Sequence, residues 1–193
     1  MEIKNKPSLV LSSSSSARKA LLDQIKLSYT SFSPLVNEKP LKGEKPKELV
    51  KRLSIIKANE AKKKFEESFI FAADTVVFAR KKYINKTENK DIAYSNIKML
   101  SGRRHTVFTG LTSITPNGKM SYYLTITKIK FKLLSEKEIF DYLKLDEWKN
   151  KAGSYAIQGF AASFIDFISG SYTSAVGLPL EKLYTILSNN GLI

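Results

Sequence analysis

The chain has 193 residues with no cysteine and one histidine, which excludes disulfides, thiolate nucleophiles, Cys-based zinc sites and His-rich metal centres. Hydrophobic residues make up 42% of it, enough for the core of a single domain over 1–193, and no apolar run approaches the ~18 residues of a membrane span. The formal net charge is +14 and the first residues lack a targeting pattern, so we expect a cytoplasmic protein with an anionic partner.

The first part of the chain predicts a strand, a serine-rich turn and a helix. The apolar run 9–11 is typical of a buried strand, and the spacing over 17–25 predicts a helix with Ser15 or Ser16 as its N-cap. Hydroxyls and backbone N–H groups at such a turn point toward one spot, which is a phosphate site. A low-complexity turn with an N-cap is the alternative. Arg18 favours the phosphate site, because a cation in the first turn opposes the helix dipole.

The most informative position is Asp74, which interrupts the β-rich apolar run 69–78. It follows a long amphipathic helix that Pro46 opens. A buried carboxylate is costly unless it has a partner such as a metal or a lysine, so a functional role is the main interpretation. The alternative is an aspartate at a strand end that faces solvent.

The remaining patterns predict further strands and helices. They are a strand at 29–32, a hairpin return at 83–85, a helix over 88–100 with Thr87 as its cap, two strands at 107–114 and 122–133 joined by the turn 116–118, a helix from the capping box at Ser135 to about 145, a strand at 164–168 and a helix from Pro179 to Gly191. Together they predict an α/β fold with a mixed sheet and helices on its faces.

Two further positions have two interpretations each. Gln158 lies in a glycine-flanked stretch, and its amide offers the donor and acceptor that suit a nucleobase edge, although a plain loop is the alternative. His105, at a strand start after Arg103 and Arg104, is more typical of a surface residue than of a base.

Taken together, these motifs resemble the Maf family over nearly the whole chain, from Leu9 to about Leu187. The motifs, in order, are Leu-Ser-Ser-Ser-Ser-Ser-Ala-Arg-Lys-Ala-Leu-Leu (11–22), Arg-Leu-Ser-x-x-Lys-Ala (52–58), Ala-Ala-Asp-Thr-Val-Val (72–77), Leu-Ser-Gly-Arg (100–103), Phe-Thr-Gly (108–110), Lys-Ala-Gly-Ser-Tyr-Ala-Ile-Gln-Gly (151–159) and Gly-Ser-Tyr-Thr-Ser-Ala-Val-Gly-Leu-Pro-Leu (170–180). Each one is weak alone, and their shared order makes the resemblance strong.

The resemblance implies a bent mixed sheet with two lobes around a central cleft, similar to the inosine triphosphate pyrophosphatases. It also implies hydrolysis of a nucleoside triphosphate to a monophosphate and pyrophosphate with a divalent cation, Mg²⁺ or Mn²⁺. The implied roles are as follows: Asp74 is the catalytic acid, Glu38 and Asp74 hold the metal, Ser13, Ser15, Arg18, Lys57 and Lys86 bind phosphate, and Thr75 and Gln158 select the base. The implied substrates are dTTP and UTP.

Two positions depart from the family pattern. The first motif of the family ends in Ser-Pro-Arg-Arg, and we interpret Ala17 in Ser16-Ala17-Arg18 as replacing an arginine tied to substrate choice. The Gly-Lys-Pro of the family stands here as Asn85-Lys86-Thr87, which keeps the lysine but alters the turn.

Two other functions remain open alternatives. One is a non-catalytic regulatory protein that inhibits septum formation, since the resemblance brings an association with arrest of cell division. The other is a basic nucleic-acid binder, which the scarcity of arginine makes the less favoured one. The resemblance is compatible with a homodimer.

Overall fold

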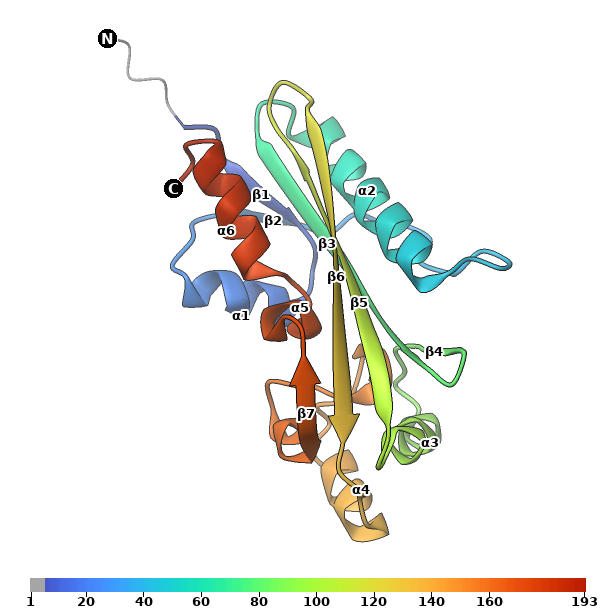
Figure 1. Cartoon of the computed structure of the whole chain (residues 1–193). Helices are drawn as coiled ribbons and strands as arrows, with labels where there is room; N and C mark the ends of the chain where they lie inside the picture. The colour runs from blue at the N-terminus through green and yellow to red at the C-terminus, as the bar shows by residue number, and fades with distance from the viewer. Residues whose placement is uncertain (1–5) are drawn as a thin grey trace. The chain divides into compact units, whose positions relative to one another are not determined.

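The computed structural model describes residues 6–193. Its elements in chain order are β1 (Leu9–Ser12), α1 (Ser16–Gln24), β2 (Thr30–Phe32), α2 (Pro46–Lys64), β3 (Phe69–Ala79), β4 (Lys82–Ile84), α3 (Lys90–Leu100), β5 (Arg104–Ile114), β6 (Met120–Phe131), α4 (Glu136–Leu143), the 3-10 helices η1 (Ala152–Ser154) and η2 (Phe160–Phe164), β7 (Ile165–Ser169), α5 (Tyr172–Val176) and α6 (Leu180–Asn189) (Figure 1).

The strands form one seven-stranded mixed sheet. Their order is β2-β1-β3-β5-β6-β7, and β4 pairs with β3. Strand β1 is parallel to both β2 and β3, whereas β4 and β7 pair antiparallel with β3 and β6. The predicted α/β fold with a mixed sheet and flanking helices is therefore confirmed.

The chain divides into two compact units. Unit 1 contains the described residues up to Asp74, together with Thr109–Leu124 and Gly177–Ile193, and unit 2 contains Thr75–Phe108 and Thr125–Val176. The long strands β3, β5 and β6 each contribute residues to both units. The predicted central cleft stays a prediction.

In unit 1, helix α2 covers one face of β1 and β3. Its buried residues recur at spacings of three and four, which is the period of one helix face. Ala58 and Ala61 on that face pack against Val10, Ile70 and Ala72 of the two strands. Figure 1 shows α2 on one side of these strands and α1 and α6 on the other.

In unit 2, helix α3 begins later than the sequence suggested. Its N-cap is Asn89, whose side-chain oxygen accepts hydrogen bonds from the backbone N–H groups of Asp91 at 2.9 Å and Ile92 at 3.0 Å. The expected cap, Thr87, instead accepts a bond from the Asn89 N–H at 3.0 Å, so it closes the turn before the helix. Both are residue types that cap helices, and asparagine is the stronger of the two.

The interpretation of His105 as a surface residue was wrong. The side chain belongs to the core of unit 2 and is only 3% exposed. Its ring lies edge-on to Phe131 and Tyr155, with centroids 5.1 and 5.5 Å away, and its Nε2 lies 2.8 Å from the Tyr155 hydroxyl. These aromatic partners come from distant parts of the sequence, which a local pattern does not show.

The buried imidazole predicts a loss of stability in mild acid. Burial lowers the pKa of His105 to about 4, below its ordinary value of 6.5. As the pH falls from 6.5 to 4, the unfolded chain takes up a proton that the folded chain does not, so stability falls by about 3 kcal/mol across that window. Urea unfolding at pH 7 and pH 4.5 should show this loss in the wild type and less of it in His105→Gln. Equal losses in both proteins would contradict it.

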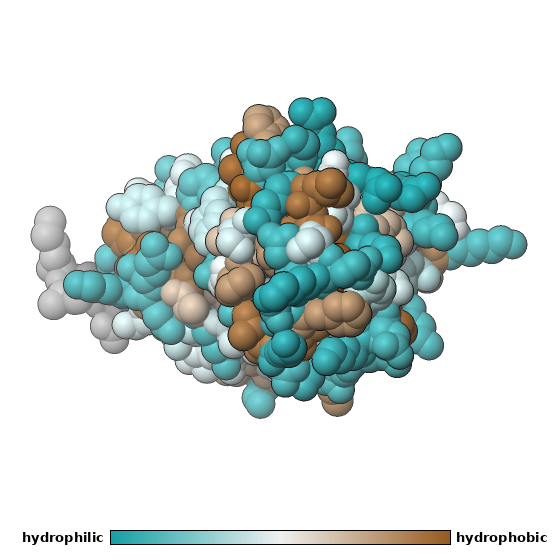
Figure 2. All heavy atoms as spheres, turned by 90° about the horizontal axis from the view of Figure 1, so that it is seen from below, coloured by the Kyte–Doolittle hydropathy of each residue, from teal (hydrophilic) through white to brown (hydrophobic). Residues whose placement is uncertain are grey.

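The face of the molecule that is seen from below carries both hydrophilic and apolar side chains (Figure 2). Figure 2 shows apolar side chains as separate spots between hydrophilic ones on the face seen from below. Within residues 6–193, no helix combines the length and the apolar character that crossing a membrane requires.

Candidate active site

The side chain of Asp74 is buried and paired. Side chains alternate between the faces of a strand, so Asp74 lies in the same row of β3 as Ile70 and Ala72, on the face that α2 covers. It is 4% exposed, and its Oδ1 accepts a hydrogen bond from Lys57 Nζ at 2.6 Å. This agrees with the expectation that a buried carboxylate has a lysine or a metal as partner, and it excludes a solvent-facing aspartate.

Lys57 bridges two carboxylates. It lies one helical turn from Leu53 and from Ala61 on the buried face of α2 and is 6% exposed. Its Nζ lies 2.5 Å from Glu38 Oε1 as well as 2.6 Å from Asp74 Oδ1. The Glu38 side chain is 43% exposed, so the cluster is open to solvent on its side. One ammonium is therefore shared by two carboxylates in one small region of unit 1.

The loop that carries Glu38 is fastened to α2 by Arg52. The guanidinium binds both carboxylate oxygens of Glu44, at 2.7 and 2.9 Å, and donates to the carbonyl of Lys39 at 3.1 Å. The hydrogen bond with Arg52 is the largest cause of a lowered pKa of Glu44, so this pair stays ionised at neutral pH. Arg52 thus holds the residue next to Glu38.

The serine-rich turn has one of the two predicted N-cap residues as its cap, and its phosphate-binding role stays a prediction. Ser15 is the N-cap of α1, and its hydroxyl accepts the backbone N–H of Arg18 at 3.4 Å. Ser13 Oγ accepts a hydrogen bond from Arg18 Nη1 at 2.9 Å. Ser12, which is fully buried, donates to the carbonyl of Lys57 at 2.7 Å. The turn is thereby joined to the residue that binds both acids.

Arg18 is a buried cation that forms hydrogen bonds with the first and the last of the three stretches of unit 1. It is 8% exposed, and its Nε donates to the carbonyl of Gly177 at 2.8 Å, across 159 residues of sequence. Burial lowers the pKa of Arg18, while the charges of Asp74 and Glu38 act in the opposite direction. Gly177 has φ +136, and a Cβ there would lie 3.4 Å from Arg18 Nε, so glycine suits this close approach.

The two acids also fit part of a divalent-cation site. The oxygens of Glu38 and Asp74 lie within 2.6 Å of the same nitrogen, so they cannot be farther apart than about twice that distance. Mg²⁺ is commonly bound by one or two carboxylates and completed by water and substrate phosphates. Residues 6–193 contain no cluster of three or more His, Cys, Asp or Glu side chains suited to a metal ion. The metal site stays a prediction.

No contact between the other predicted site residues and this cluster is described. Thr75 follows Asp74 in β3 and is half-buried, Lys86 is exposed after β4, and Gln158 is exposed in the loop between η1 and η2; all three belong to unit 2. Their roles stay predictions. Ala17 is half-buried in the first turn of α1. Aligned with Ser-Pro-Arg-Arg, Ser16-Ala17-Arg18-Lys19 has Ala17 in place of the proline and Lys19 in place of the second arginine. The interpretation of Ala17 as replacing an arginine was therefore wrong.

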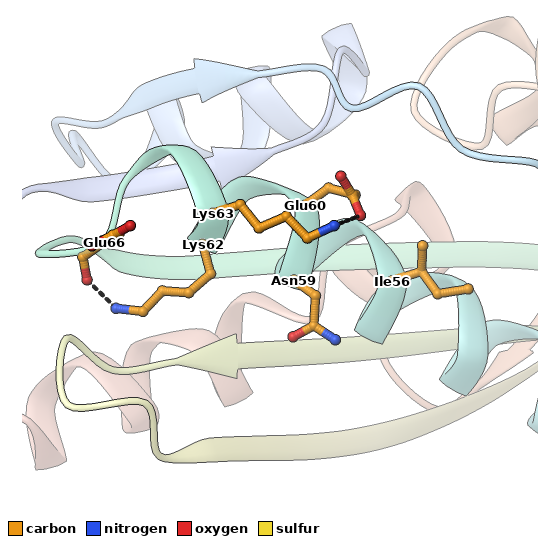
Figure 3. A pocket seen from close by; sticks show the side chains of 6 residues that line it. All are labelled: Ile56, Asn59, Glu60, Lys62, Lys63 and Glu66. Atoms are coloured by element: carbon orange, nitrogen blue, oxygen red, sulfur yellow. Dashed lines mark hydrogen bonds and ion pairs between the residues drawn. The ribbon is translucent and has the colours of Figure 1, made fainter.

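A hollow of about 590 Å³ lies elsewhere in unit 1, on α2 and the turn after it. Charged side chains that pair with their neighbours line much of it: Lys63 binds Glu60 at 2.6 Å, and Lys62 donates to the carbonyl of Glu66 (Figure 3). The hollow does not include any member of the acid and lysine cluster. We take the cluster of Glu38, Lys57 and Asp74 as the candidate site, because burying charged groups costs desolvation free energy, whereas charged groups on a solvated face carry no such cost.

The family model of the Maf-like proteins matches residues 8–190. The chain belongs to the Maf family. This Maf protein is 42% identical to the dTTP/UTP pyrophosphatase of a Chelativorans species, over 95% of this chain and 91% of the relative. It is 43% identical to the dTTP/UTP pyrophosphatase of the Wolbachia of Drosophila simulans, over 94% of this chain and 92% of the relative.

The Maf chain also has a likeness to a solved structure, the nucleoside-triphosphatase/dITP/XTP pyrophosphatase of Mycobacterium abscessus. That match has a TM-score of 0.40 and 14% identity, and it covers 64% of this chain and 74% of the other.

Three residues of the site were not singled out from the sequence. Ser12 stands one position before the predicted phosphate ligands, Arg52 opens the motif that contains Lys57, and Gly177 lies in the Val-Gly-Leu-Pro motif. Each was visible as part of a motif. Their contacts are with partners far along the chain, so the motif alone did not indicate a role.

Proposed function

We propose that this Maf protein hydrolyses nucleoside triphosphates to the monophosphate and pyrophosphate. The observation that carries the proposal is Lys57, a buried lysine that binds both Asp74 and Glu38 beside a serine turn with a second buried cation, Arg18. Anhydride hydrolysis needs cations for the phosphates and a carboxylate for the water. The names of the relatives support the same reaction, since both are pyrophosphatases.

In the proposed reaction the oxygen of water adds to the α phosphorus, and the bond from that phosphorus to the α–β bridging oxygen breaks. The bridging oxygen leaves with pyrophosphate. Asp74 accepts a proton from the water, because its carboxylate is the most buried acid of the cluster. Lys57 and Arg18 stabilise the charge that develops on the phosphate oxygens, and the hydroxyls of Ser13 and Ser15 orient the phosphates.

Glu38 and Asp74 are the residues that would hold Mg²⁺ or Mn²⁺, whose chemistry is to withdraw charge from phosphate oxygens. With such an ion present, Lys57 would exchange one carboxylate contact for a phosphate oxygen. Lys86 is proposed as a further phosphate ligand.

We further propose that dTTP and UTP are the preferred substrates. Thr75 and Gln158 carry this part of the proposal, together with the substrate that the names of the relatives state. A glutamine amide can accept from the N3–H of a pyrimidine and donate to its O4.

Gln158→Glu should lower kcat/KM for dTTP and UTP by about a hundredfold or more, because a carboxylate cannot donate to O4 and leaves a polar group unpaired. The measurement is kcat/KM for dTTP, UTP, dGTP and dATP. The folded state should be unaffected, since Gln158 is exposed. An unchanged ratio of pyrimidine to purine hydrolysis would remove Gln158 from base selection.

The decisive experiment for the function is a screen of nucleoside triphosphates with Mg²⁺ and with Mn²⁺. Products should be separated, because a monophosphate with pyrophosphate supports the proposal and a diphosphate with orthophosphate contradicts it. The septum-inhibition alternative predicts no product at all. The nucleic-acid alternative predicts DNA binding that weakens steeply with salt.

A further inference from the structure

The loop that carries Gln158 is fixed along its length, and only Gln158 and its neighbours at the far end reach solvent. Residues Gly153–Ile157 are all buried, whereas Gln158 is exposed. The first two residues of the loop have a left-handed backbone conformation, with φ +80 at Gly153 and φ +57 at Ser154. A left-handed serine needs surrounding contacts that hold it there.

Asn96 of α3 supplies one such contact. Its Nδ2 donates to Ser154 Oγ at 2.8 Å, and Ser154 has no exposed surface. Gly153 next to it has no room for a side chain, since a Cβ would lie 2.8 Å from the Tyr155 ring. The pair therefore fixes the first turn of the loop against α3.

His105 of β5 supplies the second contact, through Tyr155. The Tyr155 hydroxyl lies 2.8 Å from His105 Nε2, and the tyrosine ring packs edge-on against Phe131 with centroids 4.9 Å apart. His105 Nδ1 is buried without a hydrogen-bond partner among the described residues. One nitrogen of the buried histidine therefore has no hydrogen bond within residues 6–193, and the other binds the hydroxyl of Tyr155, which belongs to the loop.

Two more contacts hold the far end. Tyr142 of α4 accepts the backbone N–H of Ala156 at 3.1 Å, and Glu147 accepts that of Phe160 at 2.8 Å. Gln158 lies between these two points. Four residues therefore hold the eight residues from Gly153 to Phe160, and Gln158 is the exposed long polar side chain among them.

We propose that Asn96 and His105 are positioning residues that set base selectivity by holding Gly153–Gly159 in one conformation. The proposal rests on the proposed function, in which Gln158 reads the base. An amide discriminates between bases only if its oxygen and nitrogen are held in register with the base edge, and a displacement on the order of 1 Å is enough to lose this. Neither residue needs to touch the substrate.

The test compares Asn96→Ala and His105→Phe with the wild type. The ratio of kcat/KM for dTTP to that for dGTP should fall about tenfold, mostly through a higher KM for dTTP, while kcat at saturating dTTP changes little. His105→Gln keeps an amide near the place of Nε2 and should retain more of the ratio than His105→Phe. The double variant Asn96→Ala with Ser154→Ala should lose no more of the dTTP to dGTP ratio than either single variant, because both substitutions remove the same hydrogen bond.

Ser101→Ala is the matched control. Ser101 Oγ accepts the backbone N–H of Leu134 at 2.8 Å in the same unit, so this variant also loses a buried hydrogen bond but leaves the loop untouched. Its ratio should equal that of the wild type. An equal fall in Ser101→Ala would show a general loss of stability and would overturn the positioning role.

Hydrogen exchange of the loop amides distinguishes a failure of the positioning role from a failure of the proposed pyrophosphatase function. The amides of Ala156 and Phe160 should exchange faster in Asn96→Ala and His105→Phe. Faster exchange with an unchanged dTTP to dGTP ratio overturns the positioning role and leaves the pyrophosphatase function standing. A wild type that releases no pyrophosphate from any nucleotide overturns the proposed function, and the positioning role with it.

Discussion

Asp74→Asn is expected to lower kcat by about a thousandfold while the protein stays folded. Asparagine keeps the shape of the side chain and an oxygen that can accept from Lys57, but it cannot take a proton from water. Glu38 still neutralises the Lys57 ammonium, so the fold should not lose its only counter-charge at this place. The measurements are single-turnover rates with dTTP and the midpoint of thermal unfolding.

Asp166→Asn is the matched control for Asp74→Asn. Asp166 is exposed and pairs with Lys130 on the surface, so the same chemical change should leave kcat and stability almost unaltered. If Asp74→Asn keeps wild-type turnover, Asp74 has a structural role and the proposed mechanism is wrong.

Lys57→Met should reduce both activity and stability. Methionine fills a similar volume, but it leaves the buried Asp74 carboxylate without its cation and close to Glu38. Breaking a buried pair in this way costs about 3 kcal/mol, and the loss of a phosphate-binding charge should lower kcat/KM by about tenfold or more. Because Lys57 is buried, we expect a loss of stability as well as a loss of activity.

A double variant separates the two effects. Combining Lys57→Met with Asp74→Asn removes the unpaired charge, so urea unfolding should show more stability than in Lys57→Met alone, while turnover stays lost. Lys63→Met on the same helix is the control, because Lys63 is exposed and should change neither quantity. A double variant that is less stable than Lys57→Met would contradict the coupling of the two residues.

The sequence was most informative where a residue type conflicted with its pattern. Asp74 in an apolar strand indicated a buried charge with a partner. Lys57 carried a similar signal, since it occupies a buried position of an amphipathic helix. Alternation in β3 and the helical period of α2 then explain why these two side chains meet.

Other features depend on contacts between distant parts of the chain. His105 was misjudged because its aromatic partners, Phe131 and Tyr155, follow it by many residues. The tie between Arg18 and Gly177 and the anchoring of the Glu38 loop by Arg52 are of the same kind. Short-range errors were smaller: the start of α3 differed by two residues, and the five-residue helix α5 was not expected.

The hydrogen bond from Arg18 to Gly177 has a consequence for the order in which the molecule is made. Unit 1 draws on three separate stretches, and the last of them begins at Gly177. Because a ribosome delivers the chain from its N-terminus, every residue of unit 2 has been synthesised before that last stretch appears. The serine turn and Arg18 are synthesised well before Gly177, whose carbonyl accepts the hydrogen bond from Arg18 159 residues later in the sequence. The serine turn therefore gains this contact only after the last residue of unit 2 has been synthesised.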